Sequence, residues 1–462
     1  MTAPIQDFRY ALRQFRNNSA FTAIAVTTLA LGIGATTVIF SMVNGILLRP
    51  LAYRQPQQLY IVREIVPELS HTYPSLPANL ASFRIWQHEC RSFDDVAIVE
   101  PSNLTLTGEG DAEQITGARA SANLFDVLGT RPRLDRTFLP QEDNPGNDHV
   151  VILTDSFWRG RFHADSNIIG KPITLDGIPF QVIGVLPTSF RFPKQFGPLA
   201  EFPPHVDYFK PLGLDAAQWS PFGDNDFAAI ARLKPGTSAA QARSELNVVQ
   251  AGIANSRKQG MGLRAEMISL ESQIVGPARP GLLLVLAGVA AVLLIVCLNL
   301  ANLLLVRVPG RLREAGLRTA LGASRARLVQ QLLTESVLLA VIGGVLGMGL
   351  AHFGLRWLMA AAPANLPRMD EVHLDARVLW VTVFVSMATG VLFGSLPAWT
   401  IAHTEPQQVL KAGAATTTES RRARRLRASL VGFEVGVGTL LLMLAGLLSM
   451  SMVCLLRVDK VS

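Results

Sequence analysis

Five long stretches without a charged residue constrain the fold of this chain more than any other feature of its sequence. A helix needs about 20 apolar residues to cross the ~30 Å hydrocarbon core of a bilayer. Every one of these stretches is that long, and 49% of the 462 residues are hydrophobic while 17% are charged. We therefore expect five membrane spans, which contain the uncharged residues 20–48, 281–306, 336–355, 378–401 and 435–456.

The first stretch could also be read as a cleaved signal peptide, because Arg9, Arg13 and Arg16 precede it. Its 29 residues are about twice the usual apolar length of a signal peptide, and its end lacks a small-x-small cleavage pattern. We therefore interpret it as a membrane anchor.

The residues before the first span have the pattern of a helix lying in the membrane interface. Phe8, Leu12 and Phe15 follow one another at helical spacing, with arginines around them. An ordinary solvated helix end would show a similar pattern, so both readings stay open.

The basic residues predict the orientation of the spans. Arginines collect before the first span, between the second and third, and in the segment RRARRLR at 421–427 between the fourth and fifth. If each span crosses once, these three segments share one side, and the positive-inside rule makes that side the cytoplasm. The long region 49–280 then lies outside the cell membrane.

This external region has the pattern of an α+β domain. Two hairpins are predicted, with turns at 108–110 and 176–177, because glycine and Asp-Gly pairs separate alternating strand-like runs. Two strand-to-helix units are predicted at 149–162 and 227–253. The proline-rich stretch between them suggests two lobes with a boundary near 190–213.

Several catalytic classes are excluded by missing motifs. The only Gly-Lys pair, Gly170-Lys171, is followed by proline, so no phosphate-binding loop of the ATPase type is present. Neither H-E-x-x-H nor G-x-S-x-G occurs, and the eight histidines are scattered. We therefore predict no catalytic residue and no metal site, and a membrane-bound enzyme or sensor is disfavoured.

The segment 311–327 is the best candidate for function. It mixes arginines with apolar residues, favours a short amphipathic helix, and offers a break at Gly322 before a helix that leads into the third span. Such a segment could pass a push from a cytoplasmic partner to the next span. It could equally be a basic loop facing lipid headgroups, and the residues alone do not decide between these readings.

Residues 311–324, RLREAGLRTALGAS, resemble the R-x-R-E-x-x-x-R-x-A-L-G-A-S segment of the MacB/FtsX-type ABC transporter permeases. The external segments GARASANLFDVLGTRPRLDRTF, VVILTDSFWRGRFHADSNIIGKPITLDGIPFQVIGVLP and ARLKPGTSAAQARSEL are similar to the periplasmic core domain of that family. The resemblance covers the chain to about Gly413, with several motifs in the same order.

The resemblance implies a polytopic α-helical membrane protein of the bacterial inner membrane, with a two-lobed α+β periplasmic domain and a cytoplasmic N-terminus. The expected segments are a cytoplasmic helix at 1–19, spans at 20–48, 281–306, 328–358 and 378–401, periplasmic segments at 49–280 and 359–377, a coupling helix at 307–327 and a cytoplasmic linker at 402–428. The uncharged stretch near the end of the sequence adds an expected fifth span at 429–456 and a periplasmic segment at 457–462.

The resemblance also implies how the chain works. A separate or fused cytoplasmic ATPase would bind ATP, this chain would hold no cofactor itself, and the implied contacts to the ATPase are Arg313, Glu314, Arg318, Leu321, Gly322 and Ala323. Other expected partners are the lipid bilayer, a second permease unit or copy, and a periplasmic adaptor or outer-membrane channel; no nucleic acid is expected. The expected activity is efflux of an antimicrobial, macrolide or peptide by mechanotransmission. The alternative is an FtsX-like scaffold that activates a periplasmic cell-wall hydrolase.

The fifth span departs from the four-span family pattern. Residues 421–462 repeat the layout of the N-terminus, a basic segment followed by an apolar anchor. This resembles the duplicated MacB-like permeases of acidobacteria. We therefore expect these residues to open a second permease unit and the chain to be a partial product.

A few polar and small residues within the spans are predicted to pack helices together. Asn299 and Asn302 lie three apart in the second span, and Glu434 lies at the start of the fifth, where nearby arginines could also pair with it. Close helix approach is predicted along the glycines of the third span, which are Gly343, Gly344, Gly347 and Gly349.

Overall fold

The structure of the chain is a computed structural model. It describes residues 3–108, 111–197, 199–203, 205–215, 218–219, 225–256, 262–320, 324–361, 368, 371–402 and 421–458. The chain divides into two compact units, a helical unit formed by Met1–Arg49 and Ala278–Ser462 and an α+β unit formed by Pro50–Pro277. Each unit is described here by itself.

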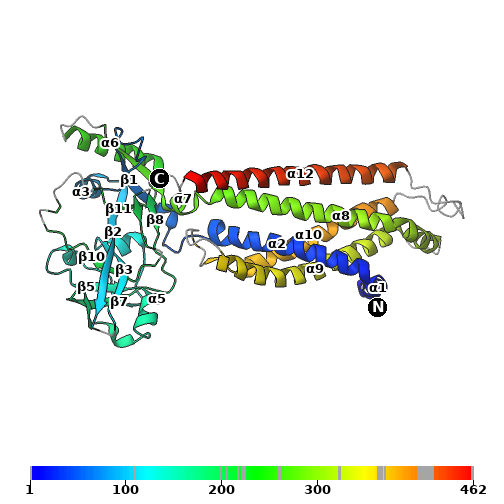
Figure 1. Cartoon of the computed structure of the whole chain (residues 1–462), viewed down its shortest axis with the longest axis horizontal. Helices are drawn as coiled ribbons and strands as arrows, with labels where there is room; N and C mark the ends of the chain where they lie inside the picture. Colours follow the sequence, from blue (N-terminus) through cyan, green and yellow to red (C-terminus); the bar gives the residue numbers. More distant parts are fainter. Residues whose placement is uncertain are drawn as a thin grey trace. The chain divides into compact units, whose positions relative to one another are not determined.

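The helical unit is a bundle of long helices that lie alongside one another (Figure 1). Its elements are α1 (Ala3–Asn17), α2 (Ser19–Val43), α8 (Arg279–Ala320), α9 (Arg325–Ala361), α10 (Ala376–Ala402) and α12 (Arg421–Val458). At its C-terminal end α2 continues as a π-helix, η1 (Asn44–Leu48).

The described part of the chain contains five helices that are long and apolar enough to cross a membrane. Their spans are Ser19–Leu48, Arg279–Arg307, Ala326–Ala360, Ala376–Trp399 and Ala428–Leu447. Each of the five predicted uncharged stretches therefore lies on one of these helices. The most apolar window of α12 has no buried residue, whereas 44% of the corresponding window of α2 is buried. The fifth span thus lies at the outside of the bundle.

Glycines bring α9 into backbone contact with α2. A Cβ added at Gly347 would lie 2.9 Å from the carbonyl oxygen of Ala30, and one added at Gly34 would lie 2.9 Å from the carbonyl oxygen of Gly347. Gly343 similarly faces Leu29. No side chain fits between the helices here, as in other membrane helix pairs with small interface residues. Gly349 faces open space, so it takes no part in this crossing.

The α+β unit is built on one ten-stranded sheet of order β12-β1-β11-β2-β3-β10-β5-β7-β4, in which β6 pairs with β2 and β7. Its strands are β1 (Leu59–Ile65), β2 (Phe93–Thr107), β3 (Glu113–Ala120), β4 (Leu134–Asp135), β5 (Val150–Leu153), β6 (Pro172–Leu175), β7 (Ile178–Val185), β10 (Tyr208–Pro211), β11 (Ala228–Leu233) and β12 (Arg264–Ser269). A separate small hairpin pairs β8 (Gln195–Gly197) with β9 (Ala200–Glu201).

The predicted hairpins and strand-to-helix units are confirmed. β2 pairs with β3, and β6 pairs with β7 around Asp176 and Gly177, whose φ angles of 48° and 79° match the left-handed turn that joins tight hairpins. β5 leads into α5 (Asp155–Arg161), and β11 leads into α6 (Ala239–Ser256).

Different helices cover the two halves of this sheet (Figure 1). α3 (Leu80–Glu89) and α6 share a core with the β12-β1-β11-β2 half, where the indole N–H of Trp86 donates to Gln250 at 2.9 Å. Trp158 of α5 is buried against the other half. The remaining helices are α4 (Leu124–Leu128) and α7 (Leu270–Val275).

The predicted lobe boundary near 190–213 is not a boundary in the structure. β10 lies within these residues and pairs in parallel with β3 and antiparallel with β5, in the middle of the sheet. The two halves are therefore joined by continuous strand pairing, and the chain returns to the first half only with β11.

We predict that Gly347→Val destabilises the bundle by about 1–3 kcal/mol, because the added side chain overpacks the crossing with α2. Thermal unfolding of the purified chain in detergent measures this. Gly349→Val is the matched control, and its expected change is within about 0.5 kcal/mol because nothing lies within 4 Å of that position. Equal unfolding temperatures for the two variants would contradict the crossing.

Candidate functional site

The predicted ATPase-contact residues lie on an extension of α8. This helix has 42 residues, which at 1.5 Å per residue span roughly 63 Å, about twice the hydrocarbon thickness of a bilayer. Its membrane span ends at Arg307, and Arg313, Glu314 and Arg318 lie in the helical part beyond it. Leu321, Gly322 and Ala323 lie outside the described residues.

Residues 307–320 of the predicted coupling helix thus continue the second span as one helix, and residues 325–327 belong to α9. Glu314 and Arg318 are four residues apart, so they occupy the same face of the extension. Sequence reasoning overlooked Pro309, which lies inside α8 just after the span. Proline has no backbone N–H and removes one i→i−4 hydrogen bond, so α8 has one backbone hydrogen bond fewer where the extension joins the span.

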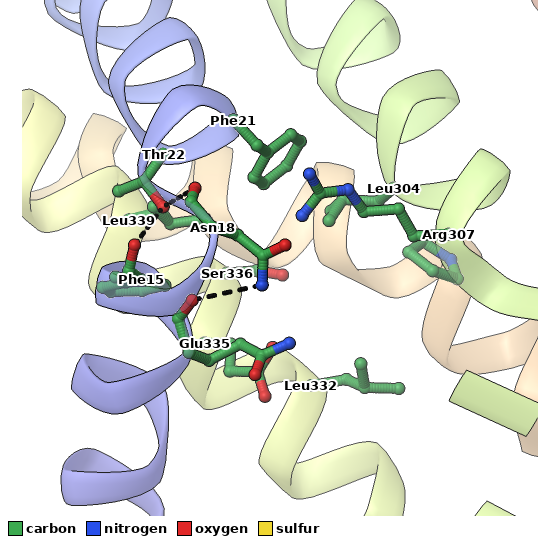
Figure 2. Close-up of a pocket in the computed structure, with 12 residues that line it drawn as sticks. Phe15, Asn18, Phe21, Thr22, Leu304, Arg307, Leu332, Glu335, Ser336 and Leu339 are labelled. Atoms are coloured by element: carbon green, nitrogen blue, oxygen red, sulfur yellow. Dashed lines mark hydrogen bonds between the residues drawn. The ribbon is translucent and has the colours of Figure 1, made fainter. Parts of the chain in front are cut away.

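The bundle holds α8 immediately before this proline (Figure 2). The guanidinium of Arg307 lies over the ring of Phe21 on α2, 3.9 Å from its centroid. A cation over an aromatic ring contributes about 0.5–2 kcal/mol, with the larger values where water is excluded. Any force on the extension therefore acts on a helix that is anchored at its membrane boundary.

Arg307 and Phe21 belong to a crevice where five helices meet. The side chain of Thr22 donates to the carbonyl oxygens of Phe15 and Asn18 at 3.2 and 3.1 Å and so fixes the junction between α1 and α2. The cavity of about 20 Å³ has room for about one water molecule and not for a cargo. Its lining is Gln14, Phe15, Asn18, Phe21, Thr22, Leu304, Arg307, Leu332, Glu335, Ser336, Leu339 and Pro397.

Glu335 is the residue in this crevice that sequence reasoning missed. It is buried on α9, with 6% of its surface exposed. A buried carboxyl inside a membrane helix is unusual and marks a position with a specific role. The sequence signal was its place between two apolar stretches, directly before the uncharged run 336–355.

The opposite end of α2, where the chain passes into the α+β unit, is held by the loop between α9 and α10. Arg368 donates to both carboxylate oxygens of Glu371 at 2.7 and 3.1 Å, and to the carbonyl oxygens of Ile46 and Arg49 at 3.1 and 2.8 Å. Helix ends leave such carbonyls without an internal partner. The arginine therefore closes the C-terminal end of the π-helix η1.

A second contact joins the same two segments. The amide of Asn44 donates to Asp375 at 3.0 Å, and Asp375 caps α10 by accepting from the N–H of Val378 at 3.0 Å. The hydrogen bond from Val378 is the main cause that holds the pKa of Asp375 below its usual value, and the hydrogen bond from Asn44 lowers it further. The carboxylate therefore stabilises this end at neutral pH, and the contribution is lost only as the pH falls through the lowered pKa.

We call Asn44, Arg368, Glu371 and Asp375 the latch. Its close packing is visible at Gly45, where an added Cβ would lie 3.0 Å from the Cα of Val372. The guanidinium is almost fully enclosed, with 7% of the Arg368 side chain exposed. Sequence reasoning did not identify the latch, because Asn44 lies more than 300 positions along the chain from its partner Asp375.

The predicted polar residues of the second and fifth spans are brought together in part. Asn299 of α8 donates to Glu434 of α12 at 2.7 Å. Asn302 lies on the same helix, but the Oδ1 of its side-chain amide is buried without a hydrogen-bond partner in the described structure. About 16 Å farther along α8, Gly288 faces Leu441 of α12. The packing role assigned to these residues stays a prediction.

We predict that Arg368→Gln lowers the free energy of unfolding by about 1.5–3 kcal/mol, because Glu371 loses a charged partner in an enclosed site. Thermal unfolding in detergent measures the loss, and Arg377→Gln, at an exposed arginine nearby, is the control. In a double-mutant cycle, adding Glu371→Gln should cost less than in the wild-type background. Additive effects of the two substitutions would contradict the latch.

We predict that Asn299→Leu loosens the fifth span by about threefold, since a hydrogen bond between membrane helices contributes about 0.6 kcal/mol. The measurement is the disulfide yield between Gly288→Cys and Leu441→Cys, with Cys297 and Cys454 replaced by alanine. Asn302→Leu is the matched control and should leave the yield unchanged. If both variants give the wild-type yield, the Asn299–Glu434 contact does not hold the span.

Comparisons with known proteins match both units. The family model of the MacB-like periplasmic core domain matches residues 22–249, and the FtsX-like permease C-terminal model matches residues 286–406. The ABC transporter permease YvrN of Bacillus subtilis, itself uncharacterized, is 30% identical over 58% of this chain and 64% of its own length. The macrolide export ATP-binding/permease protein MacB of Shigella flexneri is 28% identical over 63% of this chain and 42% of its own length.

Among solved structures, the periplasmic region of MacB from Actinobacillus actinomycetemcomitans aligns with 52% of this chain and 97% of that chain, at 14% identity and a TM-score of 0.35. The chain spans less than two thirds of the length of YvrN and of MacB from Shigella flexneri. The first family match covers most of α2 and most of the α+β unit, and the second covers most of α8 together with α9 and α10. The chain belongs to the MacB/FtsX-type family of ABC transporter permeases.

Proposed function

We propose that this chain couples a cytoplasmic ABC ATPase to movement of its α+β unit outside the membrane. The observation that supports this most directly is the continuity of α8. This helix begins at Arg279, two residues after the end of the α+β unit, and reaches Ala320 beyond the membrane span. A displacement of the extension therefore acts along one helix on the connection to the α+β unit.

The other connection to the α+β unit is made by α2, and the latch gives it a mechanical partner. The loop that holds η1 leads directly into α10 and follows α9, whose residues 325–327 are the end of the predicted coupling segment. Movement of α9 would thus reach the end of α2 through Arg368 and Asp375. Both connections would respond to the same cytoplasmic push.

We further propose that the chain works by mechanotransmission and does not conduct cargo through its own bundle. The crevice at the α1 end holds about one water molecule. Polar groups within the bundle bond to each other, as between the hydroxyls of Thr37 and Thr382 at 3.1 Å. The cargo would then be moved by the domain outside the membrane and its partners.

The relatives suggest the class of activity. MacB of Shigella flexneri is described as a macrolide exporter, and PvdT of Pseudomonas syringae pv. tomato as a pyoverdine exporter, and both are ATP-binding/permease proteins. We propose export of an antimicrobial, macrolide or peptide, with ATP bound by a separate ATPase subunit in the cytoplasm. A periplasmic adaptor, an outer-membrane channel and a second copy or permease unit are the further proposed partners.

The proposed location is the bacterial inner membrane, with the N-terminus and the α8 extension in the cytoplasm. Residues 421–462 would open a second permease unit. The similarity of residues 286–406 to an FtsX-like permease keeps the second candidate function, a scaffold that activates a periplasmic cell-wall hydrolase. A deletion strain separates the two, since loss of export gives drug sensitivity and loss of hydrolase control gives a division or lysis defect.

We predict that Glu314→Ala with Arg318→Ala lowers co-purification of the partner ATPase, and its stimulation, by at least tenfold, because both residues share the face of the extension that would meet the ATPase. A cytoplasmic ABC ATPase that co-purifies with the wild-type chain is co-expressed for the measurement. Arg424→Ala with Arg425→Ala, on exposed arginines of α12, is the control.

Correct insertion is checked with alkaline phosphatase, which should be active when fused after Gly213 and silent when fused after Ala323. Normal stimulation by the Glu314/Arg318 variant in correctly inserted protein would disprove the coupling role of these residues. An active fusion after Ala323 would place the extension outside the cell and disprove the proposed orientation.

A further inference from the structure

A large apolar groove lies on the membrane-spanning part of the bundle, between α1 and the first half of α9. Its volume is about 720 Å³, and it is shallow and widely open to its surroundings. One wall is Phe8 of α1, and the other is a face of α9 formed by Ala326, Val329, Gln330, Leu333, Thr334, Val337, Leu338 and Val341.

The groove has the length and polarity of a site for a lipid chain. From Ala326 to Val341 the helix rises about 22 Å, and one leaflet contributes roughly 15 Å of hydrocarbon. The hydroxyl of Thr334 donates to the carbonyl oxygen of Gln330 at 2.8 Å, so its hydrogen bond is made within α9. Val341 remains 39% exposed at the inner end.

The arrangement of α1 places positive charge beside this groove. Ala11 is fully buried and marks the side of α1 that packs on the bundle. The neighbouring i,i+4 row runs from Phe8, which lines the groove and is 48% exposed, through the exposed Leu12 to Arg16. The apolar wall of the groove therefore continues directly into a basic side chain.

A further row on α1 carries Arg9 and Arg13, both exposed. In the described part of the chain, no acidic side chain pairs with Arg9, Arg13 or Arg16. An amphipathic helix with an arginine edge and exposed apolar side chains lies at the boundary between headgroups and acyl chains. Its arginines attract the phosphates of anionic lipids.

We propose that the groove binds one anionic phospholipid, with an acyl chain along α9 and the phosphate on the arginine edge formed by Arg9, Arg13 and Arg16. The apolar groove matches the acyl chain of such a lipid. The arginines beside it, which have no acidic partner in the described part of the chain, match its phosphate. The site would hold α1 against α9 at the end of the bundle from which α8 extends. This inference rests on the membrane spans and does not depend on the proposed coupling to an ATPase.

The test is native mass spectrometry of the purified full chain in detergent, with dioleoylphosphatidylglycerol or dioleoylphosphatidylcholine added at equal concentration. The wild type should retain one phosphatidylglycerol per chain at least tenfold more than phosphatidylcholine, and added salt should reduce this preference. The charge variant Arg9→Gln, Arg13→Gln, Arg16→Gln should lose it by at least tenfold. Arg424→Gln with Arg425→Gln is the matched control and should keep it.

A second variant tests the groove without touching the charges. Val341→Trp fills the inner end at an exposed position, so it should fold and yet retain several-fold less phosphatidylglycerol. Equal retention of the two lipids by the wild type, or unchanged retention by either the charge variant or Val341→Trp, would overturn the proposal. A dimer of the wild-type chain that Val341→Trp dissociates would also overturn it, because a second copy would then fill the groove.

Discussion

In the hydrocarbon of a bilayer no water can bond to a free backbone N–H or C=O, and the described structure of this chain depends on that constraint. It makes each uncharged stretch a helix that satisfies its own backbone. It also explains why functional contacts collect at helix ends, where carbonyls and N–H groups lose their internal partners. The latch lies at such a place, since Arg368 bonds the carbonyls of Ile46 and Arg49.

Within the bundle, close packing of backbones replaces the hydrophobic effect, which gives no force between helices already in lipid. Gly34 and Gly347 let α2 and α9 meet without intervening side chains. Polar contacts add specificity at a few points, such as the hydrogen bond between Asn299 and Glu434. The bundle therefore has a tightly packed centre of α2, α9 and α10 and a fifth span that lies outside it.

The candidate site combines α8, a helix long enough to extend beyond the membrane, with two contacts that hold the opposite ends of α2. Arg307 on Phe21 holds α8 where it emerges, and the latch holds α2 where it enters the α+β unit. Neither contact shows in a sequence pattern. From the sequence, Arg307 was only one of several basic residues that predict the cytoplasmic side. Arg368 lies in a loop that carries no motif.

The sequence by itself determined the five spans, the α+β character of the large domain, its two hairpins and the family, because these follow from local periodicity, turn residues and ordered motifs. Only the tertiary structure decided that β10 lies in the middle of one sheet, that Gly347 packs while Gly349 does not, and that Glu335 is enclosed by five helices. It also showed the coupling segment as a continuation of α8 through Pro309. These features depend on which distant residues meet, and the energies of such contacts are not encoded in the spacing of neighbours along the chain.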